Sequence, residues 1–287
     1  MSSTTSKILT GCGFGCLAMV VVVGALGWMG YRWAQDTVAT VETATETSRE
    51  LEERFGQVRD FRPPADHGVT QERLEVFLVV RELLAGPREE LAEAVAVVAS
   101  TDGDGKAASG FRIAGAGMRI GPRALELGRA RNQTLLDNGM GLGEYIWYYW
   151  LTYHAWLGHP VAESELHDAL EERAASGGSL QMSFGGELEP DGVIWRLRRD
   201  LLAMLGNHVE DLADDPARAS WREEVEAEIE LVNADPGRVP WQDGVPPVIA
   251  ERLEPYRTRL EPTYSPATNI FEMLVLPRKE RGIRNSE

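Results

Sequence analysis

The pattern of apolar and polar positions divides the chain into two unlike parts. Residues 8–33 form an apolar run with no charged side chain between Lys7 and Arg32. Beyond this run, apolar residues recur every three or four positions among charged ones, which is typical of helices with one buried face. No stretch alternates residue by residue over the length of a strand. The pattern predicts an all-α chain: a single N-terminal transmembrane helix followed by an irregular, multi-helix soluble domain.

The apolar run is long enough to cross a bilayer, because a helix of about 20 residues spans a hydrocarbon core of about 30 Å. Trp28, Tyr31 and Trp33 stand at its end, where membrane helices carry an aromatic belt. We therefore divide the chain into a short tail (1–7), a transmembrane anchor (8–33), a juxtamembrane helical linker (34–60), a helical soluble domain (61–276) and a basic C-terminal tail (277–287).

Two features of the anchor leave alternatives open. Leu9–Cys12 resembles a lipoprotein cleavage site, although the apolar segment follows the cysteine instead of preceding it. Ala25–Gly27 has the small residues that signal peptidase requires, but the apolar run continues past them, which favours a retained anchor over cleavage. Gly11 and Gly15 form a G-x-x-x-G pair that would let two membrane helices approach closely, so a homodimer is one alternative.

The charges flanking the anchor indicate its orientation. Lys7 and the terminal amine precede the span, whereas acidic residues begin at Asp36. The positive-inside rule then places the N-terminus in the cytoplasm and the domain outside it, in the periplasm of a bacterium. Both cysteines, Cys12 and Cys16, lie within the apolar run. The domain therefore contains no disulfide and no cysteine metal site.

The net charge excludes one large class of partner. The formal charge is −16 and the isoelectric point is about 4.8. Nucleic acid binding requires clustered Lys and Arg, so we expect no nucleic acid partner. The only dense basic stretch lies at 277–284, and we interpret it as a solvated terminus. The expected partners are the bilayer, through 8–33, and a protein partner or a second copy of the chain.

Local signals predict the helices of the domain. Thr70 is a plausible N-cap for a helix that carries Leu74, Phe77 and Arg81 along one side, and Pro87 is suited to the first turn of the next helix. Gly139 is placed to end a helix as a C-cap. We expect further helices at 122–138, 143–156, 163–175, 193–212, 218–233 and 248–260, and a short closing helix or strand at 269–276.

One segment is unusually aromatic. Residues 145–156 contain four tyrosines and three tryptophans together with His154. On a regular helix, Tyr145, Tyr149 and Thr152 would share one side. The segment is interpreted as a buried central helix, as the wall of a ligand or partner groove, or as a helix lying on the bilayer. The candidate groove residues are Glu144, Tyr145, Trp147, Tyr148, Thr152 and His154.

Few residues indicate catalysis. Glu144 begins the aromatic helix, where a carboxylate is stabilised by the helix dipole, and burial among rings would instead raise its pKa and suit it to acid–base work. His159, Glu163, His167 and Glu171 are spaced four apart, but Pro160 separates the first from any helix, so we expect no metal and no cofactor. Motifs of zinc proteases, serine hydrolases and P-loop enzymes are absent from the sequence.

No motif is specific enough to assign the chain to a family. The sequence favours a membrane-anchored helical protein that acts as a binding or interaction module. The alternative is a membrane-tethered hydrolase-like enzyme with an aromatic cleft around Glu144 and His154.

Overall fold

The computed structural model describes residues 45–99, 109–161 and 190–274, with side chains at 45–97, 120–161 and 194–274. The predicted anchor (8–33), the predicted helix at 163–175 and the basic tail (277–287) lie outside these ranges. Every regular element in the described ranges is helical, which confirms the all-α prediction. None of the described helices is both long and apolar enough to cross a membrane. The chain from Ala44 onward forms one compact unit, separate from residues 1–43.

A helix at 45–55 opens the described chain and packs into its core. Leu51 on this helix and Val58 on the following 3-10 turn η1 (Val58–Asp60) are both buried in the main core. Gly143 approaches this turn so closely that a Cβ added to it would lie 2.5 Å from the carbonyl oxygen of Val58. Residues 45–60, which we expected to be part of a linker, thus belong to the packed unit.

The helices α2 (Gln71–Leu83) and α3 (Ala85–Ala99) form where the sequence predicts them. The Thr70 side chain accepts a hydrogen bond from the Arg73 N–H at 3.4 Å, which confirms the predicted N-cap. Pro87 lies in the first turn of α3, where its missing N–H costs nothing. The predicted stripe of α2 is buried, and it includes Arg81.

Helix α4 (Ser109–Asp137) corrects our expectation that a helix begins at Pro122. Proline inside a helix removes a backbone hydrogen bond and costs about 3 kcal/mol, which is why the sequence favours Pro122 as a helix start. Packing against α3 offsets this cost, since Ile120 and Leu127 are buried with residues of α3 in a second, small core. The predicted end is confirmed: Gly139 has φ +63°, and its N–H bonds to the Leu136 carbonyl.

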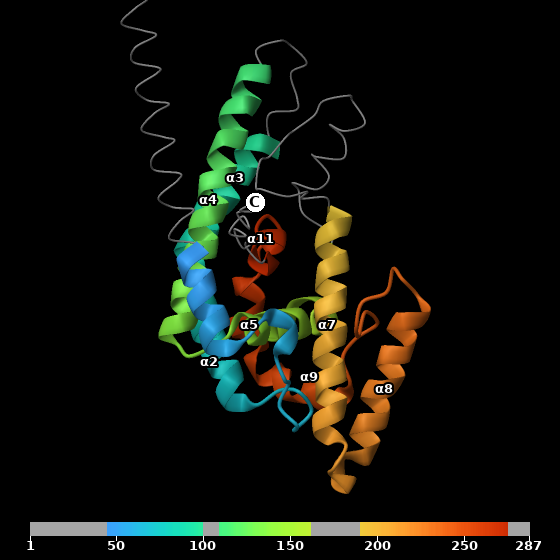
Figure 1. The fold of residues 1–287 in the computed structure, drawn as a ribbon. Coiled ribbons are helices and arrows are strands. Elements are labelled where there is room, and N and C mark those ends of the chain that lie inside the picture. The colour runs from blue at the N-terminus through green and yellow to red at the C-terminus, as the bar shows by residue number, and fades with distance from the viewer. Residues whose placement is uncertain (1–44, 100–108, 162–189, 275–287) are drawn as a thin grey trace, which may run out of the picture. The chain divides into compact units, whose positions relative to one another are not determined.

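The aromatic segment forms α5 (Leu142–Tyr149), which continues directly into a π-helix, η3 (Trp150–Trp156). We expected one regular α-helix. Figure 1 shows α5 running crosswise between the upright helices α4 and α7. All residues from Tyr145 to Ala155 are buried, which places this segment at the centre of the main core.

A helical hairpin flanks the aromatic segment. Helix α7 (Pro190–Leu212) begins three residues before the predicted start at 193, and after η4 (Pro216–Arg218) the chain returns as α8 (Ala219–Ala234). Trp221 and Val225 of α8 are buried in the main core. Arg198 of α7 donates to the carbonyls of Val232 at 2.6 Å and Arg238 at 3.0 Å, which ties the ends of the hairpin together.

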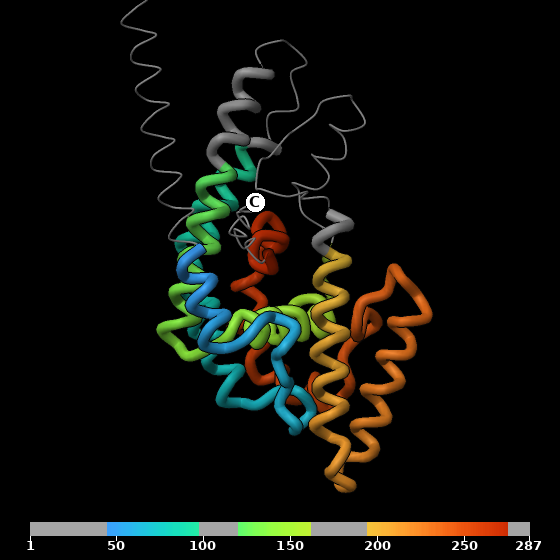
Figure 2. Tube along the Cα trace, in the orientation of Figure 1, coloured from blue at the N-terminus to red at the C-terminus, as the bar shows by residue number. Residues whose placement is uncertain are grey.

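The C-terminal part of the described chain consists of short helices. The expected helix at 248–260 is divided into α9 (Pro247–Leu253), η5 (Glu254–Tyr256) and α10 (Arg257–Leu260), because Pro255 cannot donate to an α-helical ladder. After η6 (Glu261–Thr263), the closing element at 269 is a helix, α11 (Asn269–Met273). Figure 2 traces this path back across the aromatic segment, and α11 ends against α4.

Candidate functional site

The aromatic segment changes its helical pitch halfway along. A π-helix hydrogen-bonds each residue to the fifth one before it, is rare, and occurs mostly as single turns near functional sites. Here it covers Trp150–Trp156, and its end is closed by the bond from the Leu157 N–H to the Thr152 carbonyl at 3.0 Å. The side chains of Tyr145, Tyr149 and Tyr153 form a row of rings, and the ring centroid of Tyr153 lies 4.7 Å from that of Tyr149.

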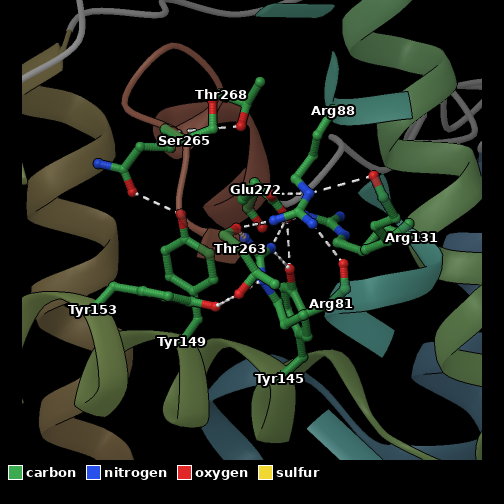
Figure 3. Close-up of polar contacts among 12 residues, drawn as sticks. Arg81, Arg88, Arg131, Tyr145, Tyr149, Tyr153, Thr263, Ser265, Thr268 and Glu272 are labelled. Carbon is green, nitrogen blue, oxygen red and sulfur yellow. Dashed lines mark hydrogen bonds and ion pairs between the residues drawn. The ribbon is translucent and has the colours of Figure 1, made fainter. Parts of the chain in front are cut away.

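A charged cluster lies against this row of tyrosines (Figure 3). Arg81 of α2 is fully buried and donates through Nη1 to Tyr145 at 2.7 Å and to the Oε2 atom of Glu272 at 2.6 Å. The Tyr145 hydroxyl in turn donates to the same carboxylate oxygen at 2.6 Å. The Arg81 guanidinium carbon lies 4.9 Å from the ring centre of Tyr149 and 5.1 Å from that of Tyr153. Arg81 therefore joins α2, the aromatic segment and α11.

Two further arginines surround the same carboxylate. Arg88 of α3 lies 3.8 Å from Glu272 and donates to the Arg81 carbonyl at 2.6 Å. Arg131 of α4 donates to the backbone carbonyls of Glu272 at 2.6 Å and Leu274 at 3.0 Å. Two buried guanidinium groups thus pair with the Glu272 carboxylate, and a third, that of Arg131, binds the backbone beside it. The remaining positive charge is offset by backbone oxygens at the C-terminal end of α11, which carry partial negative charge.

Electrostatics in the cluster keeps the carboxylate ionised. Burial alone would raise the pKa of Glu272, but the charges of Arg81 and Arg88 and the Tyr145 hydrogen bond outweigh burial and lower it. Burial raises the pKa of Tyr145 far above its ordinary value, so this tyrosine stays neutral and donates. The Oε1 atom of Glu272 has no hydrogen-bond partner. The cluster is a polar core that holds α11 in place.

Glu144 is engaged in a pair of hydrogen bonds with Arg73 of α2. Its two carboxylate oxygens accept from Nε at 2.6 Å and from Nη2 at 2.7 Å. The Glu144 side chain is 12% exposed and that of Arg73 is 27% exposed. The bond to Glu144 raises the pKa of Arg73 above its ordinary value. Arg73 also caps the preceding turn by donating to the Gly139 carbonyl at 3.0 Å, so Glu144 positions an arginine that links α2 to the start of α5.

The polar tips of the other rings find partners on different elements. The Tyr148 hydroxyl accepts from the Thr70 N–H at 3.1 Å, and burial raises its pKa to about 12. The Trp147 indole donates to the Gly68 carbonyl at 2.8 Å. The Trp150 indole donates to the Pro240 carbonyl at 2.9 Å. These bonds tie the aromatic segment to loops on several sides, since tryptophan and tyrosine rings bury apolar area while keeping one polar handle bonded.

His154 connects the end of the segment to α11. Its Nδ1 atom lies 2.7 Å from the His159 carbonyl oxygen, and its Nε2 atom lies 3.1 Å from the Oδ1 atom of Asn269. Burial lowers the pKa of His154 to about 4, against the opposing effect of these two contacts, so the ring is neutral at pH 7. A neutral imidazole donates through one nitrogen only. The second nitrogen therefore faces an oxygen to which it cannot donate unless the ring is protonated.

Five of the six candidate groove residues are buried and Glu144 is partly exposed, but the six are not gathered at one point. Tyr145 belongs to the arginine cluster, Glu144 to Arg73, and His154 to α11. The hydroxyl of Thr152 is buried without a hydrogen-bond partner. They diverge because neighbouring residues of a helix point in different directions around its axis. Within the described residues, no group of three histidine, cysteine, aspartate or glutamate side chains is placed to hold a metal ion.

Reasoning from the sequence missed the arginine cluster. The pattern places Arg81 in an otherwise apolar stripe without indicating a role, and it does not single out Arg88, Arg131 or Glu272. One signal was present: an arginine among the core positions of a helix requires a buried acceptor. Its acceptor, Glu272, could not be identified in this way because it lies far along the chain.

Comparisons with other proteins add no functional assignment. No protein-family model matches the chain, and no curated protein or solved structure resembles it significantly. Its function has to be inferred from the chemistry of its own residues.

Proposed function

We propose that this chain is a membrane-anchored helical protein that acts as a binding or interaction module on the outer side of a bacterial cytoplasmic membrane. Residues 8–33 would anchor it in the bilayer. The compact unit that starts at Ala44 would present its surface to a protein partner or to a second copy of the chain. The apolar run and the charges that flank it support this arrangement.

The observation that carries the binding role is the use of the aromatic segment as scaffold. Several of its polar groups form hydrogen bonds within the fold. The Tyr145 and Tyr148 hydroxyls, the Trp147 indole and the Glu144 carboxylate are each bonded to a residue outside the segment. Such bonded networks rigidify a core and define one arrangement of the helices. Recognition of a partner would then depend on side chains exposed at the surface.

The contacts do not favour the enzymatic alternative. An acid–base residue needs access to substrate and a pKa near the working pH. Glu144 is bonded through both oxygens to Arg73. The pKa of His154 is lowered to about 4, and its Nδ1 atom is bonded to the His159 carbonyl.

Anchoring is tested with the full chain expressed in bacteria. We expect it to stay with membranes after alkaline carbonate washing, and we expect Val20→Arg/Val22→Arg to release it, because charges at the centre of a span are costly. Protease added to spheroplasts should digest the domain if it faces outward. Release of the unaltered chain by carbonate would refute the anchor, and protection of the domain would refute the orientation.

Binding is tested in the same cells with a photo-crosslinking amino acid. Leu83 and Leu231 are 60% and 52% exposed, and either position could lie within an interface. We expect a crosslinked species of fixed mass from at least one of them, and none from the exposed polar position Glu224 as a matched control. Equal labelling at all three positions would show only random collision and would contradict the interaction role.

A further inference from the structure

The first turns of α7 expose an aromatic ring beside two guanidinium groups. Trp195 is 58% exposed, an unusually large apolar area to leave uncovered. Arg199, four residues later on the same face, places its guanidinium carbon 5.3 Å from the centre of the indole ring. Arg196 is also exposed. This group, Trp195 with Arg196 and Arg199, is called the α7 patch below.

The charges on the α7 patch are only partly balanced by the protein. Arg199 bonds to Asp200 at 2.8 Å, yet the Arg199 side chain remains 49% exposed while that of Asp200 is 11% exposed. Both arginines thus present positive charge outward from a chain with a net charge of −16. Glu230 and Asp235 are exposed on and just after α8. The patch is therefore a local basic and aromatic spot on an acidic protein.

Tryptophan and arginine together suit the interface of a lipid bilayer. Tryptophan prefers the level of the headgroups, where its ring is half apolar and half polar. Arginine binds phosphate through a rigid fork of donors and extends along apolar surface to reach it. Tryptophan and arginine also occur at centres of protein interfaces, so composition alone does not choose the occupant.

The tether favours the bilayer. If residues 8–33 span the membrane, the linker at 34–44 keeps the start of the helix at 45 within about 40 Å of the bilayer, even when fully extended. The helix at 45–55 and α7 both begin at their upper ends in Figure 1. The α7 patch thus lies toward the side on which the described chain begins. Tethering gives a high effective concentration of headgroups, so a weak contact is sufficient.

We propose that the α7 patch contacts the headgroup region of the membrane, with Trp195 in the interface and Arg196 and Arg199 on lipid phosphates. This inference rests on the proposed membrane anchor. The acidic remainder of the domain is repelled by anionic lipid, so one local attractive spot fixes which side of the domain faces the bilayer. The contact orients the module on the membrane surface.

The test uses the full chain in nanodiscs containing phosphatidylglycerol. The emission of wild-type protein minus that of Trp195→Phe isolates Trp195, because the other tryptophans are common to both. Lipids brominated near the headgroup quench tryptophans that contact them, and we expect the difference emission to fall about twofold or more, as for an interfacial ring. Arg196→Glu/Arg199→Glu should abolish the quenching. Arg218→Glu/Arg222→Glu alters the net charge equally at the other end of the hairpin and should leave it intact.

The outcomes separate this contact from the anchor. If the chain stays in the discs and Trp195 is not quenched, the contact is overturned and the anchor stands. If quenching survives Arg196→Glu/Arg199→Glu, the guanidinium groups do not hold the patch to lipid, and the proposal is also overturned. If the chain does not incorporate into discs at all, both the anchor and the contact fail.

Discussion

Replacing Glu272 with glutamine should be among the most destabilising single-atom changes in this chain. The carboxylate is fully buried, lies 2.6 Å from Arg81 and 3.8 Å from Arg88, and accepts from Tyr145. Glutamine has nearly the same shape, so the cavity term is negligible. It removes the only negative side chain among three buried guanidinium groups and turns an –NH2 group toward groups that are themselves donors.

The expected magnitude follows from the burial. Breaking a buried ion pair by removing one partner costs about 3–5 kcal/mol, because the other charge stays buried without compensation. A domain is stable by only about 5–15 kcal/mol, so this loss is a large part of the total. Glu144→Gln, at a partly exposed pair, should cost about 1–2 kcal/mol. Glu82→Gln, at the exposed pair with Arg259, should cost less than about 1 kcal/mol.

The assay is urea unfolding of the full chain in mild detergent, followed by near-ultraviolet circular dichroism, which reports the packing of the aromatic rings. A cost for Glu272→Gln no larger than that for Glu82→Gln would refute the reasoning. If the variant is too unstable to purify, the double change Arg81→Met/Glu272→Leu supplies the test. Removing both charges together should destabilise less than removing the carboxylate alone, since Arg81 is then no longer buried without its acceptor and only Arg88 loses an ion-pair partner.

Three further outcomes are expected. His154 should contribute a fall in the free energy of unfolding of about 1.4 kcal/mol per pH unit as the pH drops from 6.5 toward 4, because the unfolded chain protonates this residue while the folded chain keeps it neutral until its pKa of about 4. Urea unfolding of wild type and His154→Gln between pH 7 and pH 5 measures this contribution, and an equal slope in the two proteins would contradict the assignment. Gly143→Ala should lower the free energy of unfolding by about 1–3 kcal/mol, since the added methyl group would meet the Val58 carbonyl oxygen. Gly206→Ala, with open space around it, should be neutral or stabilising. Equal urea midpoints for the two variants would argue against the close approach at Gly143. Trp147→Phe should cost about 1–3 kcal/mol in the same assay, because a buried carbonyl 2.8 Å from the indole N–H loses its donor, and a midpoint within error of the wild type would contradict this.

Local signals in the sequence were sufficient for much of the helical framework. The Thr70 cap and the Gly139 termination involve atoms three to five residues apart, so the residues that make each bond are visible in one short window. The all-α class follows from the same periodicity. Local signals misled at Pro122, which lies inside α4, because the packing that offsets its lost hydrogen bond comes from another helix.

The role of the aromatic segment was decided only by tertiary structure. Its composition left a core, a groove and a membrane surface open, and a ring pattern alone does not distinguish them, since tryptophan and tyrosine serve all three. The bonds that bury it reach Gly68 on one side and Asn269 on another. Contacts at such separations depend on the arrangement of whole helices, which no local window contains.

The sequence by itself therefore predicted most of the described helices and several of their ends, and showed that a charged, cysteine-free part of the chain follows an apolar run. Tertiary structure alone decided that Arg81 meets Glu272 across most of the chain, and that the segment from Trp150 onward adopts a π-helix. The physical reason is one of range. Helix propensity and capping act within a turn or two, whereas a buried charge is tolerated only when a distant element brings its partner.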